Sequence, residues 1–334
     1  MTLRAKISGT GMYVPERVVT NDDLALLMDT SDEWIQQRSG IVTRRHVEPG
    51  QQPSELAEQA SRRALEAAGC EADEIDCILL ATLSAEAEFP GTSYFLQERL
   101  EIGEVPCFDL RAQCSGFVYA LSVANSFVRA GTYERVLVVG CEVHSTGLDY
   151  STEGRDVTVL FGDGAGAIVV EANRDAQDTG EILEIRLHAQ GKHAKQLWIE
   201  SPGSGHKPRL TTELVDQKTH FPKMNGRFVF KHAVRRMPEV LRETLSAASL
   251  KIEDVDLFLF HQANLRINEA VAGHLGIPPE KCPHNIDRYG NCSAASIPML
   301  LDECLRDGRA KAGDLVSMTS FGSGFSWTSS VTRL

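Results

Sequence analysis

The chain has 334 residues, of which 42% are hydrophobic and 24% are charged, and its formal net charge is −12 at pH 7. This length allows a large core, shared by about two domain-sized units. The acidic balance argues against a nucleic-acid partner, so an anionic ligand would need a local basic patch.

The apolar runs are strand-sized, such as VLVV at 136–139, and are too short to span a bilayer. The first residues contain no continuous apolar segment of the kind found in secretory signals. The eight cysteines form no CxxC pair and no compact cluster with histidine, which argues against a zinc site. We therefore expect a cytoplasmic protein with buried free thiols, no metal and no membrane partner.

Short apolar strands alternate with helical segments along the chain. A strand near 105–110 precedes GFVYALSVANSFV at 116–128, which is apolar nearly all round and is expected to be a helix buried at the centre. Further on, a strand at 256–260 precedes a helix at 264–276. This alternation is typical of parallel strands covered by helices on both faces.

Two pairs of segments resemble each other in the same order. Residues 63–82 resemble 243–262 at an offset of 180, and 113–140 resemble 291–320 at an offset near 178, each of the latter copies opening with Cys-Ser. Such self-similarity indicates an internal duplication.

The duplication predicts an α/β fold of five layers, helix–sheet–helix–sheet–helix. We expect one half at 1–175 and the other at 176–334. Ligands of such sheets gather at the carboxyl ends of the strands.

Three polar residues stand at predicted strand–helix junctions: Cys114, His261 and Asn291. A thiol at a helix N-terminus meets unpaired N–H groups and the positive end of the helix dipole, both of which favour the thiolate. Each residue also has a structural interpretation, as a buried thiol, a backbone-bonded histidine and a turn asparagine. Their combination with the duplication favours a nucleophilic site.

Six motifs resemble those of thiolase-fold condensing enzymes, most closely the 3-oxoacyl-[acyl-carrier-protein] synthase III family, and they occur in the family's order. These are TSDEWIQQRSGI (30–41), QCSGFVYAL (113–121), LFGDGAGA (160–167), HQANLRI (261–267), YGNCSAASIP (289–298) and FGSGFSW (321–327).

The resemblance implies acyl transfer from acyl-CoA to Cys114 and then decarboxylative condensation with malonyl-acyl carrier protein, at the start of fatty acid synthesis or a related pathway. His261 and Asn291 would hydrogen-bond the malonyl thioester, and backbone N–H groups of Cys114 and Ser323 would hold the oxyanion. Acyl-CoA would be a substrate, and no cofactor is implied.

The resemblance also implies CoA contacts, a homodimer and a contact of Phe89 with the acyl pocket of its partner. An aromatic face suits adenine and guanidinium groups suit phosphate, whereas a half-buried core Trp, solvated arginines and ordinary packing of Phe89 are the structural alternatives. The implied CoA-binding residues are Trp34, Arg38, Arg155, Asn264 and Arg266.

The chain departs from the family pattern at Cys292, where Thr is common, and at Ser323, where Gly is common. The helix after Arg266 has no lysines of the kind that often dock a carrier protein, which weakens the implied carrier partner. The long connection at 188–227 is expected near the mouth of the site, where it would influence substrate choice.

Other functions remain open at this stage. A non-decarboxylating acyl-CoA condensing enzyme and an acyltransferase would use the same cysteine. A non-catalytic partner subunit would lack it, and a Cys/His hydrolase would need water, which the apolar FVYAL segment at 117–121 disfavours. A biosynthetic thiolase would need a second cysteine in FGSGF at 321–325.

Overall fold

The computed structural model describes residues 3–175, 177–178 and 180–334. Its two main sheets are built from short, buried strands. The first sheet contains β1 (Arg4–Tyr13), β4 (Cys77–Ala81), β5 (Cys107–Leu110), β6 (Arg135–Glu142) and β7 (Gly164–Asn173). The second contains β8 (Glu181–Ala189), β11 (Leu257–Phe260), β12 (Leu315–Gly322) and β13 (Ser326–Arg333). The strand orders β1-β7-β6-β4-β5 and β8-β13-β12-β11 match each other apart from β5.

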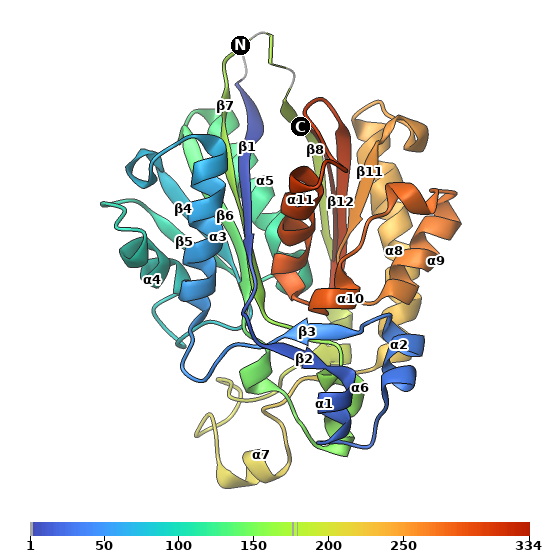
Figure 1. Ribbon diagram of the computed structural model, residues 1–334. Coiled ribbons are helices and arrows are strands. Elements are labelled where there is room, and N and C mark those ends of the chain that lie inside the picture. The colour runs from blue at the N-terminus through green and yellow to red at the C-terminus, as the bar shows by residue number, and fades with distance from the viewer. Residues whose placement is uncertain (1–2, 176, 179) are drawn as a thin grey trace.

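Helices complete five layers around these sheets (Figure 1). Helices cover the outer face of the first sheet, lie between the two sheets, and cover the outer face of the second. In that order they are α3 (Pro53–Ala68) and α4 (Thr92–Arg99), α5 (Gly116–Ala130) and α11 (Ser296–Arg306), and α8 (Gly226–Ala247) and α9 (Leu265–Leu275). The predicted five-layer α/β fold is confirmed, including the buried central helix.

The strand directions are more mixed than the sequence pattern predicts. β4 runs parallel to β5 and β6, and β11 runs parallel to β12. The pairs β6–β7 and β12–β13 are antiparallel instead. A turn of three residues, 323–325, joins β12 to β13, and so short a link can connect only antiparallel neighbours.

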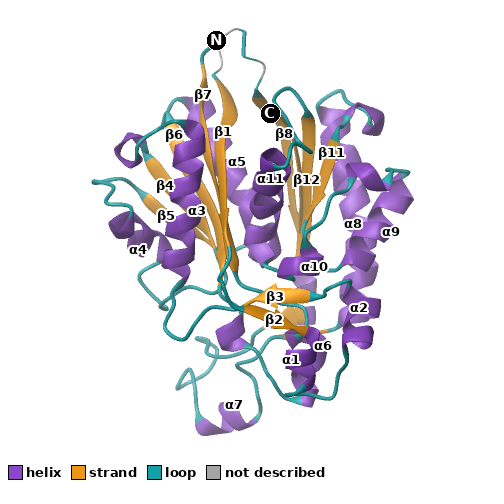
Figure 2. Ribbon diagram, viewed as in Figure 1, coloured by secondary structure: helices purple, strands orange, loops and turns teal. Residues whose placement is uncertain are grey.

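The remaining elements gather at one end of the sheets, where β4 and β6 finish (Figure 2). This end has short helices and two small, two-stranded sheets, β2–β3 and β9–β10. The elements are β2 (Val18–Thr20), α1 (Asn21–Ala25), α2 (Asp32–Ser39), β3 (Thr43–Arg45), α6 (Arg155–Thr158), β9 (Leu197–Trp198), α7 (Thr212–Asp216), β10 (Lys223–Met224) and α10 (Ile286–Tyr289). Within the described part of the chain, every helix is too short or too polar to cross a bilayer.

From β4 to β6, the first half repeats in the second at an offset of 180 residues, as β11 to β12. The turn Gln113–Ser115 before α5 corresponds to Ser293–Ala295 before α11, and both turns begin at a left-handed residue, with φ of 45° at Gln113 and 44° at Ser293. The sequence match was therefore wrong by two residues at this point, because it aligned two Cys-Ser pairs, whereas the repeated feature is the backbone turn. Cys114 corresponds to Ala294, and not to Cys292.

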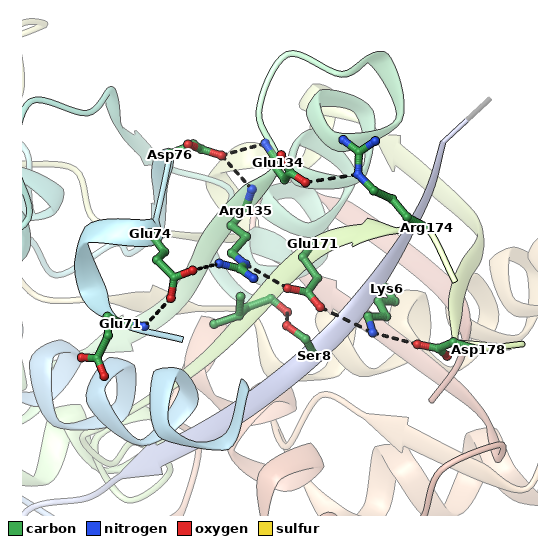
Figure 3. Close-up of polar contacts among 11 residues, drawn as sticks. Lys6, Ser8, Glu71, Glu74, Asp76, Glu134, Arg135, Glu171, Arg174 and Asp178 are labelled. Carbon is green, nitrogen blue, oxygen red and sulfur yellow. Dashed lines mark hydrogen bonds and ion pairs between the residues drawn. The ribbon is translucent and has the colours of Figure 1, made fainter. Parts of the chain in front are cut away.

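Ion pairs join the strands of the first sheet at the end away from these turns (Figure 3). Arg135 pairs with Glu74 and, at 3.0 Å, with Glu171. Lys6 lies 3.4 Å from Glu171 and 2.7 Å from Asp178. Such partly exposed pairs each contribute about 1 kcal/mol or less, so they adjust the alignment of β1, β6 and β7 more than they stabilise the fold.

Candidate active site

Cys114 lies in the turn that leads into α5 and is 9% exposed. The end of β12 passes directly against it: a Cβ added to Gly322 would lie 2.9 Å from Cys114 Cβ. Glycine is therefore required there for the two backbones to approach. The backbone N–H groups of Cys114 and Ser323 each lower the pKa of the thiol, although burial has the larger, opposite effect. N–H groups beside a reactive sulfur are the kind of donor from which an oxyanion hole is built.

Burial raises the pKa of the Cys114 thiol to about 11. Opposing influences come from Ser293, whose Oγ lies 3.6 Å from Sγ, and from the two backbone N–H groups. The helix end favours the thiolate, but the cost of placing a charge in a dry site outweighs that stabilisation here. With this raised pKa, Cys114 is a neutral thiol at pH 7.

His261 follows β11 and is 2% exposed. Its backbone N–H donates to Thr319 O at 2.9 Å, and its Nδ1 lies 2.7 Å from Ser296 Oγ. Burial lowers the pKa of the imidazole to about 3, so the ring is neutral at physiological pH. Nε2 has no hydrogen-bond partner within the described residues. It is therefore the ring nitrogen left for a ligand.

Asn291 is fixed through both its backbone and its side chain. It forms a parallel bridge with Phe161, and its N–H donates to Leu160 O at 2.8 Å. The side-chain Oδ1 accepts a hydrogen bond from the Ser293 N–H at 2.8 Å. Because the oxygen is engaged in this way, Asn291 has its amide Nδ2 to offer as a donor.

A cavity of about 970 Å³ brings the three predicted residues together, with Cys114, His261 and Asn291 all in its wall. Leu197 and Met224 of the 188–227 connection also line it, as expected for a segment near the mouth. The structure thus assembles a thiol and two neutral groups with hydrogen-bonding capacity in one partly apolar cavity.

Four of the residues expected to contact CoA line the same cavity: Trp34, Arg38, Arg155 and Asn264. The guanidinium of Arg38 lies 4.2 Å from the centre of the Trp34 ring, and that of Arg155 lies 5.1 Å from it. An aromatic face flanked by two cations suits a stacked base beside phosphate groups.

Arg266 and Phe89 lie elsewhere. Arg266 donates to the backbone oxygens of Gln36 and Gln37 at the end of α2 and pairs with Glu269 at 3.0 Å. Phe89 is 83% exposed and is not in the cavity wall formed by the described residues of one chain. Their expected roles therefore remain predictions.

Two buried titratable residues near the site escaped the sequence interpretation. Glu142, at the end of β6, accepts hydrogen bonds from Ser84 Oγ at 2.6 Å and the Leu83 N–H at 3.1 Å, and burial raises its pKa to about 7. His144 packs on Phe161 with ring centres 4.5 Å apart, and burial lowers its pKa to about 3. For Glu142, the signal available in the sequence was a charged residue directly after the apolar run at 136–141.

Groups of three or more side chains that could hold a metal ion are absent from residues 3–175, 177–178 and 180–334. The geometry is that of a cysteine site whose charge is managed by neutral donors and backbone N–H groups.

Comparison with known proteins identifies the family. Residues 108–191 match the family model described as 3-oxoacyl-[acyl-carrier-protein] synthase III, and residues 245–334 match its C-terminal model. A beta-ketoacyl-[acyl-carrier-protein] synthase III of Xanthomonas campestris pv. campestris is 46% identical over 98% of both chains, and one of Methylococcus capsulatus is 43% identical over the full length of both. The chain belongs to this family.

A solved structure extends the comparison to three dimensions. The 3-oxoacyl-[acyl-carrier-protein] synthase III of Aquifex aeolicus superposes with a TM-score of 0.90 at 42% identity, covering 99% of this chain and all of that one. The family resemblance inferred from the six motifs is confirmed, and so is the thiolase-like fold.

Proposed function

We propose that this protein condenses an acyl-CoA primer with malonyl-acyl carrier protein in the cytoplasm, giving 3-oxoacyl-acyl carrier protein, carbon dioxide and free CoA. The observation that carries the proposal is the single cavity that holds Cys114, His261 and Asn291 below the cation-flanked ring of Trp34. Family membership at 46% identity supports the same reaction.

In the first step the Cys114 sulfur attacks the thioester carbonyl of the primer. A sulfur–carbon bond forms, the bond to CoA breaks, and the thiol proton leaves with CoA as its free thiol. Because burial keeps Cys114 protonated until it reacts, this proton transfer accompanies the attack. The backbone N–H groups of Cys114 and Ser323 hold the oxygen that becomes negative.

In the second step the malonyl thioester loses carbon dioxide and becomes an enolate. The Asn291 amide and His261 Nε2 hydrogen-bond its oxygen, which gains charge as the carbon–carbon bond breaks. The enolate carbon then attacks the acyl-Cys114 carbonyl, and the cysteine leaves as a thiolate that takes a proton from solvent. Neutral donors suit this task because they stabilise the enolate without protonating its carbon.

The carrier protein meets the mouth of the cavity at the start of α8. Arg227 lines the mouth, and Lys231 lies one helical turn further on the same face; both are exposed. These cations substitute for the lysines that α9 lacks. Reversing both charges, as Arg227→Glu with Lys231→Glu, should raise KM for malonyl-acyl carrier protein about tenfold. KM for malonyl-CoA should rise less, since this substrate meets Arg227 in the cavity wall but has no carrier protein to dock. Equal KM values for the wild type and the variant would remove this docking site.

The same proposal includes a homodimer formed along β5, an edge strand of the first sheet. Phe108 on this strand is 42% exposed, and Phe89 nearby in sequence is 83% exposed. Exposed aromatic rings beside an unpaired strand edge favour pairing with a second copy. Phe89 would then contact the acyl pocket of the partner. Phe89→Asp should lower the dimer fraction in sedimentation velocity, and an unchanged fraction would count against this contact.

The deciding experiment is intact-protein mass spectrometry after mixing the protein with acyl-CoAs of increasing length. An acyl adduct that is absent from Cys114→Ala, and that malonyl-acyl carrier protein clears with release of carbon dioxide, supports the proposal. An adduct that clears only with a second acyl-CoA, an alcohol or an amine would instead indicate the non-decarboxylating or acyltransferase alternative. Absence of an adduct from every donor would indicate a non-catalytic subunit.

A further inference from the structure

The duplicated halves differ at one pair of equivalent positions beside the site. At the 180-residue offset, His261 corresponds to Ala81 and Ser296 to Gly116. In the first half these positions carry almost no side chain and pack closely, since a Cβ added to Gly116 would lie 3.0 Å from Ala81 Cβ. In the second half they hold two side chains joined by a hydrogen bond of 2.7 Å. The shared backbone therefore does not require Ser296, whereas His261 gains a direct partner from it.

The bonds of the Ser296 hydroxyl fix the direction of its proton. The Gln262 N–H donates to Ser296 Oγ at 3.3 Å, so the oxygen already acts as an acceptor. Ser296 is 2% exposed, and a buried hydroxyl proton needs an acceptor. Within the described residues, the other hydrogen-bond partner of this hydroxyl is His261 Nδ1. Nδ1 therefore accepts, and a neutral imidazole that accepts at Nδ1 carries its proton on Nε2.

We propose that Ser296 is a positioning residue that holds His261 as the Nε2–H tautomer, aimed at the malonyl thioester oxygen. This inference rests on the proposed function and assigns a part of it. The opposite tautomer would present a lone pair to the developing enolate and repel it. Ser296 therefore serves decarboxylation and has no direct part in the transfer of the primer to Cys114.

The test compares Ser296→Ala and Ser296→Thr with the wild type. Ring nitrogen shifts of ¹⁵N-labelled histidine, with the His261 signals assigned by their loss in His261→Asn, report the tautomer without any substrate. We expect protonated Nε2 in the wild type and in Ser296→Thr, and a mixture of tautomers in Ser296→Ala. Decarboxylation of malonyl-CoA should fall roughly ten- to a hundredfold in Ser296→Ala, and acylation of Cys114 should change less than about twofold.

Ser61→Ala is the matched control, because Ser61 is another fully buried serine, in α3 and outside the cavity wall. Its ring-nitrogen spectrum and both rates should match the wild type. Equal losses of acylation and decarboxylation in Ser296→Ala would indicate general damage and overturn the proposal, as would an unchanged tautomer. If the wild type itself fails to decarboxylate malonyl-CoA, the proposed function fails, while the nitrogen shifts still decide the tautomer.

Discussion

Each half of this protein has a niche formed by the turn before its central helix and by the strand end that packs against this turn. The two niches hold different groups. In one niche Cys114 faces the bare backbone of Gly322. In the other, their counterparts at the 180-residue offset are Ala294 and Glu142, and Ser293 and the Ala294 N–H lower the pKa of the Glu142 carboxyl against the larger effect of burial. The Ala294 N–H is the counterpart of the Cys114 N–H. The same turn thus lies beside an internal carboxyl group in one half and beside the bare backbone of a glycine in the other.

This difference indicates how one backbone plan supports two tasks. In the proposed reaction the first half supplies the nucleophile, and the second supplies the neutral groups His261 and Asn291. Each task would then depend on a few side chains, while the backbone around them is repeated in both halves.

The largest expected effect tests which of two nearby cysteines, Cys114 or Cys292, carries the acyl group. Cys114→Ala should abolish acyl-enzyme formation and lower condensation by a factor of about a thousand or more. Cys292→Ala should retain most activity, because burial raises the pKa of this second thiol well above its usual range. Mass spectrometry of the acyl adduct and of the condensation product, for both variants, checks which cysteine is the nucleophile. Loss of the adduct in Cys292→Ala alone would reverse the two roles.

The second effect concerns the donors of the other half. Asn291→Asp places a negative charge where the enolate forms, and we expect decarboxylation to fall roughly a hundredfold or more while acylation falls far less. Single-turnover rates of the two steps, measured separately, give this ratio. Equal losses in both steps would show that Asn291 acts on the structure of the whole site.

The third effect tests the contact between the halves. The Cβ of Gly322→Ala would lie 2.9 Å from Cys114 Cβ and 3.1 Å from Cys114 N, so the nucleophile must shift. Acylation should fall roughly tenfold or more, with a loss of about 1–3 kcal/mol in the free energy of unfolding. Gly273→Ala in α9 is the control, since its added Cβ meets open space. Wild-type rates in Gly322→Ala would mean that this contact is not needed.

The smallest effect on catalysis is expected at Glu142, where the change is one of stability and its dependence on pH. Its pKa is raised from 4.5 to about 7, so the folded protein retains a proton that the unfolded chain has lost between these pH values. The stabilisation is complete below pH 4.5 and is lost as pH rises through 7, by on the order of 3 kcal/mol. Glu142→Gln should therefore gain stability relative to the wild type at pH 8 but not at pH 4.5. Urea unfolding at both values measures this, and a pH-independent difference would contradict the assigned ionisation.

Features that depend on local pattern were predictable from the sequence. The apolar strand runs, the buried helix at 116–128 and the placement of Cys114 and His261 after strands all follow from hydrophobic period and element order. The expected strand–helix junction at Asn291 was wrong, because Asn291 follows the short helix α10 and forms only an isolated bridge with Phe161. The exact register of the repeat did not follow from the sequence. The two Cys-Ser pairs suggested one alignment, whereas the equivalent backbone turns, which a sequence does not display, lie two residues away from it.

The remaining features depend on contacts between distant segments. Ser296 meets His261 across 35 residues of chain, and Gly322 meets Cys114 across the interface of the halves. The raised pKa of the Cys114 thiol depends on such contacts as well, since the sequence indicates the helix end but not how deeply the sulfur is buried. Arg266 was expected at a ligand, and the structure shows it bound to the end of α2.

The occupied niche also sets the loading capacity of the enzyme. Ala294 has no nucleophilic side chain, and its N–H lies close enough to the Glu142 carboxyl to lower the pKa of that group. Under the proposed function the duplicated fold therefore holds one covalent intermediate per polypeptide, and not two. Saturating primer should therefore add a single acyl mass to each chain, and the next primer must wait until the product leaves Cys114.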